Sequence, residues 1–302
     1  YMISTQGSST TRAAQFAFDQ GGNIYDAAVA ASFAISVERP HSTGIGGGGF
    51  MVLNHAKTKK YEAYDFREMA PRMANSKMFL DKNGKQIVEK SLTGPFASGT
   101  PGLVAGVLAV HKKYGILPLQ KVMQPSIALA RNGFKIYPGL AKALKAKAKK
   151  LCKYPASKKI FLNRDCSPKK LGEHLYQKDL ANTLEIISKK NWGGFYEGKI
   201  AKKIIASQKK YGGLMRLSDL RNYKVKLRDP IVGSYKGYKV VSMPPPSSGG
   251  THVVQILNIL EGYDLKGMGA QSAEAIHLTS SAMQIAFADR AEYMGDSDFK
   301  SV

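Results

Sequence analysis

Two segments near the start of the chain have the apolar pattern of helices. Residues 10–20 (TTRAAQFAFDQ) predict a helix that ends at the dipeptide Gly21-Gly22. Residues 26–37 (DAAVAASFAISV) are almost wholly apolar, and a helix that is apolar on every side is typical of a buried position. We therefore expect this second helix to need another layer of structure to cover it.

Short apolar runs separated by turn residues predict two antiparallel hairpins. Residues 50–53 and 60–66 flank the polar turn NHAKTK. Residues 231–235 and 238–242 flank a Lys-Gly dipeptide, which is typical of a tight hairpin turn. Both pairs contain short strands that can hydrogen bond to each other without a long crossover.

Helical segments make up most of the remaining chain. They are expected at residues 103–113, 119–132, 141–153, 179–190, about 200–210, 219–223, 251–261 and about 272–293. Ser218 is expected to cap the short helix over 219–223. Because the strands come as hairpins rather than as βαβ units, the pattern favours an α+β fold with antiparallel sheet. No repeat and no Pro/Ser-rich linker divides the sequence, so residues 1–302 are expected to form a single domain.

The charge of the chain is strongly positive. Its 302 residues include 45 Lys and Arg against 22 Asp and Glu, a formal net charge of +23. Such a balance suggests binding to nucleic acid or to another anionic surface. The lysines, however, lie mainly on amphipathic helices, and no RNA-recognition or zinc-finger motif accompanies them, so we expect no nucleic-acid binding. A solvated surface and an acidic partner chain remain as explanations. No apolar run is long enough to span a bilayer.

Cysteine and histidine offer little evidence for a metal or redox site. Cys152 and Cys166 are too few for a disulfide framework or a CxxC zinc site. They can pair in an oxidising compartment or remain as free thiols. The six histidines lack HExxH or other metal spacing, so no metal is expected. His41 and His252 lie beside glycine-rich loops. His252, in the first turn of a helix, and His111, within a helix, are expected to be packed or surface residues rather than ligands. The loop SSGG at 247–250 looks like an oxyanion loop but is expected to cap the following helix.

The stretch HSTGIGGGGF, residues 41–50, is the most unusual local feature. A Walker phosphate loop needs a following Lys-Ser/Thr pair, and here Phe50 follows the glycines. A dinucleotide fingerprint needs a strand before the glycines and a helix after them, whereas the order here is reversed. The remaining explanation is steric, because glycine permits positive φ and close backbone approach. We expect the glycines to turn the buried helix into the hairpin that positions DFRE, residues 65–68.

Several longer motifs resemble those of gamma-glutamyltransferase, also called gamma-glutamyltranspeptidase. In chain order they are residues 21–50, YDFREMAP at 64–71, residues 91–115, MPPPSSGGTHVVQILNILEGYDL at 243–265, and FADRAEYMGDSDF at 287–299. They span nearly the whole chain and correspond to the large chain of that enzyme. The resemblance implies an N-terminal-nucleophile hydrolase, a four-layer αββα sandwich completed by a separate small chain. Both chains would arise from one self-cleaving precursor.

The resemblance also implies a mechanism in which the catalytic residue lies outside this chain. The N-terminal Thr of the small chain attacks the γ-carbonyl of glutathione or another γ-glutamyl compound, with its own α-amino group as base. An acyl-enzyme forms and passes the γ-glutamyl group to an amino acid, a peptide or water. The implied protein is a heterodimer, able to pair into a dimer of heterodimers, without metal or other cofactor, and periplasmic or secreted.

One site residue follows from the resemblance, namely Arg67 of the DFRE motif. The matching Arg of the family holds the α-carboxylate of the substrate. A guanidinium matches a carboxylate with two parallel hydrogen bonds, which Lys cannot provide. From residue type alone, Arg67 could instead form a structural ion pair with Asp65 or Glu68.

Two other functions compete with this one. A related enzyme would act on cephalosporin side chains or poly-γ-glutamate, and a protein of another class would be a basic polyanion-binding module without catalysis. If the resemblance is right, the chain alone should be inactive and incompletely folded, because the nucleophile is absent and its apolar helix and hairpins lack a covering layer.

Overall fold

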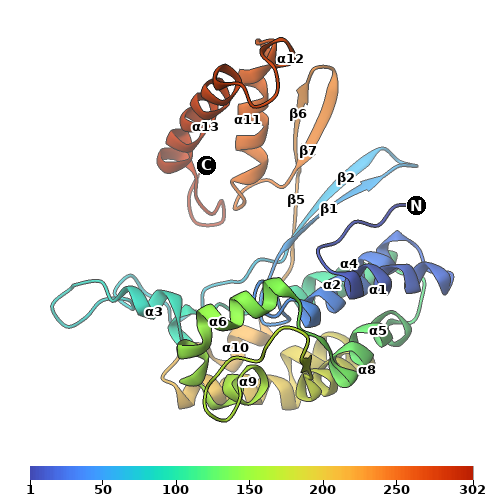
Figure 1. Cartoon of the computed structure of the whole chain (residues 1–302), viewed down its shortest axis with the longest axis vertical. Coiled ribbons are helices and arrows are strands. Elements are labelled where there is room, and N and C mark those ends of the chain that lie inside the picture. The colour runs from blue at the N-terminus through green and yellow to red at the C-terminus, as the bar shows by residue number, and fades with distance from the viewer. Residues whose placement is uncertain (302) are drawn as a thin grey trace. The chain divides into compact units, whose positions relative to one another are not determined.

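The computed structural model describes residues 1–301, which group into two compact units (Figure 1). Unit 1 comprises residues 1–49 and 66–225, and unit 2 comprises residues 50–65 and those from 226 onward. Helices and antiparallel strands occur together, which confirms the α+β prediction. The β1–β2 hairpin of unit 2 is thus an insertion between two parts of unit 1.

Unit 1 is mostly helical. Its elements are α1 (Ser8–Asp19), α2 (Ile24–Glu38), α3 (Val88–Leu92), η1 (Pro95–Ala97), α4 (Leu103–Tyr114), α5 (Leu119–Asn132), β3 (Phe134–Lys135), α6 (Pro138–Cys152), α7 (Pro155–Phe161), β4 (His174–Leu175), α8 (Lys178–Tyr196), α9 (Gly198–Lys210) and α10 (Leu217–Arg221). Strands β3 and β4 form a two-stranded antiparallel ladder.

The apolar helix α2 lies at the centre of unit 1. Its first turn is closed by a capping box, in which the Asn23 side chain accepts from Asp26 N and the Asp26 carboxylate accepts from Asn23 N. Helices α1, α4 and α5 pack around it, and Val29, Phe33 and Val37 are fully buried. The expectation that this helix needs a layer from elsewhere is therefore wrong, because its neighbours in the same chain cover it.

The helix expected at residues 179–190 continues further than its pattern indicates. Helix α8 runs to Tyr196, with a break at Asn191, whose φ of 51° and ψ of −138° are not helical. The short piece after the break carries Phe195 and Tyr196 into the core. The polar residues Lys189, Lys190 and Asn191 interrupt the apolar period, so the sequence pattern predicts a helix that ends at 190.

The start of α10 differs from the prediction. The helix begins at Leu217, so Ser218 lies inside it and is not its cap. The carboxylate of Asp219 instead accepts a hydrogen bond of 2.7 Å from the backbone N–H of Arg216. A carboxylate that reaches back from the first turn stabilises a helix start as a capping serine would. Asp219 therefore takes the role that the sequence analysis gave to Ser218.

Unit 2 contains two small sheets and three helices. Its elements are β1 (Phe50–His55), β2 (Lys60–Asp65), β5 (Lys226–Arg228), β6 (Ile231–Tyr235), β7 (Tyr238–Ser242), α11 (Gly249–Glu261), α12 (Leu265–Met268) and α13 (Ala273–Tyr293). The strand order of the larger sheet is β1-β2-β5, all antiparallel.

Both predicted hairpins are present in unit 2. Phe50 pairs with Asp65 in the first, and Ile231 pairs with Ser242 in the second. Lys236 and Gly237 both have positive φ, 48° and 80°, the backbone that a two-residue hairpin turn requires. Helix α11 packs against the β6–β7 hairpin and against α13 (Figure 1).

The two cysteines, left open by the sequence, form a disulfide between Cys152 and Cys166. Their Cα atoms are 5.6 Å apart, and the bond connects the end of α6 to the loop after α7. Among the residues described, no helix combines the length and the apolar character that crossing a membrane requires.

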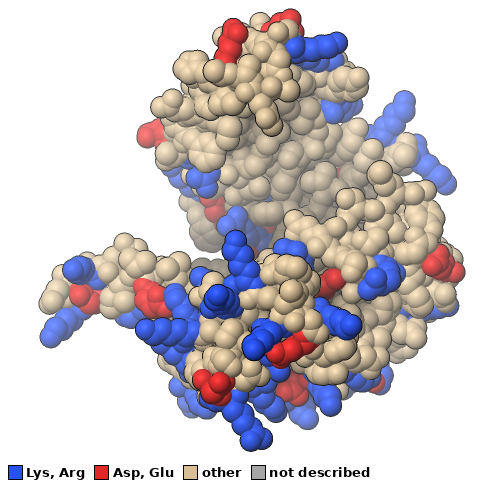
Figure 2. Space-filling view, in the orientation of Figure 1, with Lys and Arg blue, Asp and Glu red and all other residues tan. Residues whose placement is uncertain are grey.

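The two units differ in charge (Figure 2). Unit 1 has 35 Lys and Arg against 12 Asp and Glu, whereas unit 2 has ten of each. All of the +23 net charge therefore belongs to unit 1. Much of it lies on the helices that the sequence marked as amphipathic, α6 and α9, where the lysines are mainly half-buried or exposed.

Candidate functional site

The glycine stretch lies directly against the segment that carries Arg67. A Cβ at Gly48 would lie 2.5 Å from the Phe66 carbonyl oxygen and 2.8 Å from the Arg67 Cα. Gly49 and Phe66 exchange two backbone hydrogen bonds of 3.2 and 3.1 Å. The expected close backbone approach is confirmed, because any side chain at position 48 would collide with main-chain atoms.

The other half of the steric explanation is wrong. No glycine between residues 44 and 49 has positive φ, so this stretch turns without left-handed backbone. One of its carbonyl groups accepts hydrogen bonds from a neighbouring segment. The Gly47 oxygen accepts from the N–H groups of Gly102 and Leu103, at 2.9 Å each. The glycine stretch is thereby bonded to the start of α4.

The segment from Arg67 to Arg72 is anchored at three places within unit 1. The Tyr223 hydroxyl donates to the Arg67 carbonyl oxygen at 2.8 Å. Met69 and Thr100 exchange backbone hydrogen bonds of 3.2 and 2.7 Å. The Arg72 N–H donates to the Asp219 carboxylate at 3.1 Å. The backbone is therefore restrained, while the Arg67 side chain is exposed.

Two glycines, Gly102 at the cap position of α4 and Gly106 within it, allow the helix to approach this segment. A Cβ at Gly102 would overlap both the Phe66 carbonyl oxygen and the Tyr223 hydroxyl, and one at Gly106 would overlap the Phe66 ring. The buried Phe66 side chain therefore lies against the helix. This packing holds Phe66, the residue immediately before Arg67, against α4.

Two tyrosines lie behind the anchored segment. The rings of Tyr196 and Tyr223 stack with centroids 5.9 Å apart. The Tyr196 hydroxyl donates to the Pro101 carbonyl at 2.9 Å and accepts from the Ala105 N–H at 3.1 Å. Burial raises the pKa of Tyr196, so its hydroxyl keeps its proton and remains a donor.

Sequence reasoning proposes Arg67 as a site residue, but it does not find the residues that hold the Arg67 backbone. Tyr223 and Asp219 lie about 150 positions later in the chain, on or just after α10. Neither belongs to a motif with a recognisable spacing relative to DFRE. Only the folded chain brings them next to the segment.

Asp65, one of the acidic neighbours of Arg67 in the sequence, is part of an ion-pair cluster in unit 2. Arg228 Nε donates to Asp65 at 2.7 Å, and its Nη2 donates to Asp298 at 2.8 Å. Lys226 also pairs with Asp298. Hydrogen bonds from Arg228 and Lys226 lower the pKa of Asp298 to about 2.

The expectation that the serine-rich loop caps α11 is wrong for the cap side chain, because Ser248 makes no side-chain cap hydrogen bond. Ser248 occupies the cap position, but its hydroxyl accepts from Arg290 Nε at 2.9 Å. The Ser247 hydroxyl accepts from the Gly249 N–H at 3.3 Å. His252 is buried and its Nδ1 lies 2.8 Å from the Ser248 carbonyl oxygen, so it is a packed residue.

The described residues contain no cluster of three or more His, Cys, Asp or Glu side chains that could hold a metal ion. His41 is exposed, and partial desolvation, followed by the charge of Arg39, lowers its pKa. At neutral pH the His41 imidazole is therefore mainly uncharged.

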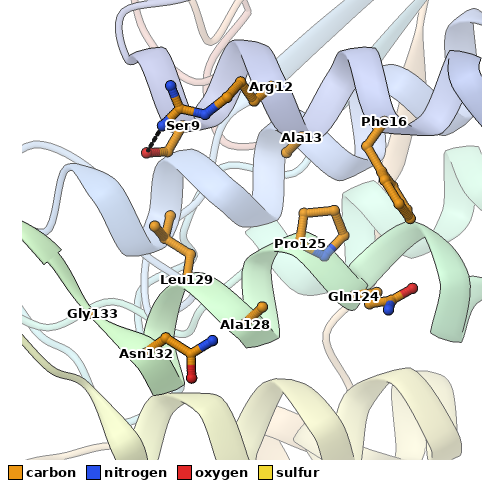
Figure 3. Close-up of a pocket in the computed structure, with 10 residues that line it drawn as sticks. All are labelled: Ser9, Arg12, Ala13, Phe16, Gln124, Pro125, Ala128, Leu129, Asn132 and Gly133. Atoms are coloured by element: carbon orange, nitrogen blue, oxygen red, sulfur yellow. Dashed lines mark hydrogen bonds between the residues drawn. The ribbon is translucent and has the colours of Figure 1, made fainter.

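Two cavities of unit 1 have volumes of about 460 Å³ each. One lies between α1 and α5, where Arg12 donates to Ser9 (Figure 3). The other is lined by Gly46 of the glycine stretch, by Ser98 and Gly99, and by apolar side chains of α9. This second cavity adjoins the backbone that supports Arg67, because Gly99 also lies against Glu68.

Comparison with known proteins gives a consistent result. Residues 10–302 match the family described as Gamma-glutamyltranspeptidase. The chain is 44% identical to the glutathione hydrolase proenzyme of Escherichia coli (strain K12), over all of this chain and 52% of that protein. It is 38% identical to the acylase ACY 1 proenzyme of Pseudomonas sp. (strain SE83), over 93% of this chain and 51% of that protein.

A solved structure is also similar over the full chain. The crystal structure of Helicobacter pylori gamma-glutamyltranspeptidase matches with a TM-score of 0.97 at 44% identity, covering 100% of this chain and 86% of that one. The chain spans about half the length of the curated proenzymes that it matches.

Proposed function

The chain belongs to the gamma-glutamyltranspeptidase family, and from this premise we propose that it is the large chain of an enzyme that cleaves the γ-glutamyl bond of glutathione and related compounds. The γ-glutamyl group passes to an amino acid, a peptide or water. The N-terminal Thr of a small chain, cut from the same precursor, supplies the nucleophile and forms the acyl-enzyme. The names of the relatives as proenzymes and the coverage of about half their length support this division.

The contribution of this chain is substrate binding, through Arg67. The guanidinium pairs with the α-carboxylate of the γ-glutamyl substrate by two hydrogen bonds. The observation that carries this assignment is an exposed arginine on a backbone held by Tyr223, Thr100 and Asp219. A fixed backbone below an exposed cation suits a binding group that must meet its ligand in one orientation.

Replacing Arg67 tests the assignment. Arg67→Lys keeps the charge but loses the two-point contact, and Arg67→Ala leaves the substrate carboxylate without its partner. Loss of a charge-assisted pair costs about 2–5 kcal/mol when the partner is buried, so kcat/KM should fall roughly 30-fold to more than 1000-fold. The contact is remote from the bond that breaks, so KM should carry much of the loss.

Self-cleavage into two chains should survive in both variants, because it needs no substrate carboxylate. Gel analysis of processing and kinetics with a γ-glutamyl anilide give the two readouts. Normal processing with parental kcat/KM in both variants would show that Arg67 is a structural residue and that the assignment is wrong.

The two-chain architecture can be tested separately. The native protein, purified under denaturing conditions, should yield a second chain that begins with Thr, and the two chains together should form the single four-layer αββα domain of the N-terminal-nucleophile hydrolases. A lone 302-residue chain that binds polyanions would instead support a basic binding module.

A second substrate class has support in the 38% identity to an acylase. This alternative enzyme would remove cephalosporin side chains or cleave poly-γ-glutamate. Assay of the purified two-chain protein with a γ-glutamyl anilide, a cephalosporin and poly-γ-glutamate in parallel decides between them. The proposed function requires the highest kcat/KM for the γ-glutamyl anilide.

We further propose that the protein is periplasmic or secreted and works as a heterodimer, or a dimer of heterodimers, without a cofactor. The Cys152–Cys166 disulfide supports export, since such bonds persist in oxidising compartments. Alkylation of freshly prepared native protein followed by mass spectrometry tests the bond, and two alkylated cysteines would contradict it.

A further inference from the structure

We propose that Tyr223 is a positioning residue for substrate binding, acting through the backbone of Arg67. The inference rests on the proposed function, because it assigns Tyr223 a role in the same substrate contact. Tyr223 touches neither the substrate nor the reacting bond in this proposal. Its hydroxyl determines where the Arg67 peptide group lies.

The geometry behind this inference is a hydrogen bond to the main chain of the binding residue itself. The Tyr223 hydroxyl donates to the Arg67 carbonyl oxygen at 2.8 Å. Tyr223 is 5% exposed, so water competes poorly for this bond. The other two anchors act on Met69 and Arg72, which lie two and five residues further along the segment.

The Tyr223 hydroxyl is itself held in place. Its ring stacks on that of Tyr196, which is fully buried and bonded to the backbone at Pro101 and Ala105. Gly102 leaves space for the hydroxyl beside the Phe66 carbonyl, where any Cβ would overlap both groups. A tyrosine restrained on this many sides holds its hydrogen-bond partner in a narrow range of positions.

The position of the Arg67 peptide determines the direction in which the side chain leaves the backbone. The two-point contact with a carboxylate needs the planar guanidinium at a defined angle and distance. If the Tyr223 hydroxyl is lost, the carbonyl loses its restraint and the guanidinium samples more orientations. Only the fraction of molecules with the guanidinium in the correct orientation then binds the substrate. Binding is weaker, but the chemistry at the nucleophile is unchanged.

The variant Tyr223→Phe in the full precursor tests the inference, because it removes the hydroxyl and keeps the ring that stacks on Tyr196. We expect KM for a γ-glutamyl anilide to rise about five- to ten-fold, the usual effect of one lost hydrogen bond, and kcat to stay within about twofold. Processing into two chains should be normal.

Tyr137→Phe is a matched control. Its hydroxyl also donates to a backbone carbonyl in unit 1, that of Glu38 at 3.2 Å, but Glu38 belongs to the end of α2 and not to the Arg67–Arg72 segment. Its KM should stay at the parental value. The double variant Arg67→Ala/Tyr223→Phe should be no worse than Arg67→Ala, since Tyr223 acts only through Arg67.

The outcomes separate this inference from the proposed function. If Arg67→Ala loses activity while Tyr223→Phe keeps the parental KM, the role of Tyr223 is wrong and the assignment of Arg67 stands. If Tyr223→Phe and Tyr137→Phe raise KM equally, or if the double variant loses more than Arg67→Ala, Tyr223 is a structural residue. If Arg67→Ala keeps parental kinetics, both assignments are wrong.

Discussion

Units 1 and 2 differ in how far their helices bury their apolar side chains. Unit 1 buries its apolar helix α2 so completely that Phe33 is 0% exposed, and the main hydrophobic cluster of the described chain belongs to it. In unit 2, helix α13 has 21 residues but buries only Ala282 and Ala286, and its Phe287 is 56% exposed. Helix α2 is covered by its own chain, whereas α13, which packs against α11, keeps several large apolar side chains exposed.

Charge follows the same division. Unit 1 carries the whole net charge of +23, and unit 2 carries none. Large exposed apolar residues on a neutral surface mark an interaction region, whereas a lysine-rich surface around a complete core favours solubility. If the proposed small chain binds, the comparison predicts that the exposed apolar residues of unit 2 form part of its contact surface.

The largest expected effect comes from removing the partner. Residues 1–302 expressed alone should show no turnover of a γ-glutamyl anilide, because the proposed function places the nucleophile on the small chain. By amide hydrogen exchange, α2 should be protected and α13 should exchange rapidly in this chain, while both should be protected in the two-chain protein.

Turnover comparable to that of the two-chain enzyme would refute the assignment of catalysis to the missing chain. Equal protection of α2 and α13 in the chain alone would show that α13 is as well covered as α2 and that the contrast between the two units is wrong.

Truncating one phenylalanine in each helix sharpens the comparison. In the chain alone, Phe33→Ala should lower the free energy of unfolding by about 3–5 kcal/mol, since it leaves a cavity in a closed core. Phe287→Ala should change it by less than about 0.5 kcal/mol. Urea unfolding measures both, and the Phe287 variant should become clearly destabilising in the two-chain protein.

A methyl group at Gly48 tests the close approach in unit 1. The added Cβ would lie 2.5 Å from the Phe66 carbonyl oxygen, so Gly48→Ala should cost about 1–3 kcal/mol and displace Arg67. We expect KM for the γ-glutamyl donor to rise. Gly46→Ala is the control, because nothing lies within 4 Å of its added Cβ. Equal kinetics of the two variants would contradict the steric role of Gly48.

The smallest expected effect is a local acid transition in unit 2. The pKa of Asp298 is lowered to about 2 by Arg228 and Lys226, so its ion pairs stabilise the fold above the ordinary pKa of 3.8. This contribution is lost as the pH falls from about 4 through 2. Amide exchange around residues 296–299 should increase over that range. Asp298→Asn should show the increase already at neutral pH, with no further step.

Part of this protein could be predicted from the sequence alone. The apolar periods located α2 and α5, and the Lys-Gly turn located the β6–β7 hairpin, because these features depend on residues close together in the chain. Motif resemblance identified the family, and it also singled out Arg67, whose role in substrate binding stays a prediction. The glycine stretch indicated a close approach to another backbone segment, although the sequence did not show which segment.

Other features were decided only by tertiary structure. The pattern predicted that α2 is buried but could not say by which helices, so the prediction of a missing layer was wrong for α2, whereas α13 remains exposed in this chain. Likewise the cap of α10 passed from Ser218 to Asp219, whose carboxylate also anchors Arg72. Tyr223 meets Arg67 across 156 positions, and no local pattern records such a contact. Burial and hydrogen bonding between distant residues depend on the packing of the whole chain. Local propensity contains no information about which distant residue a given residue will contact.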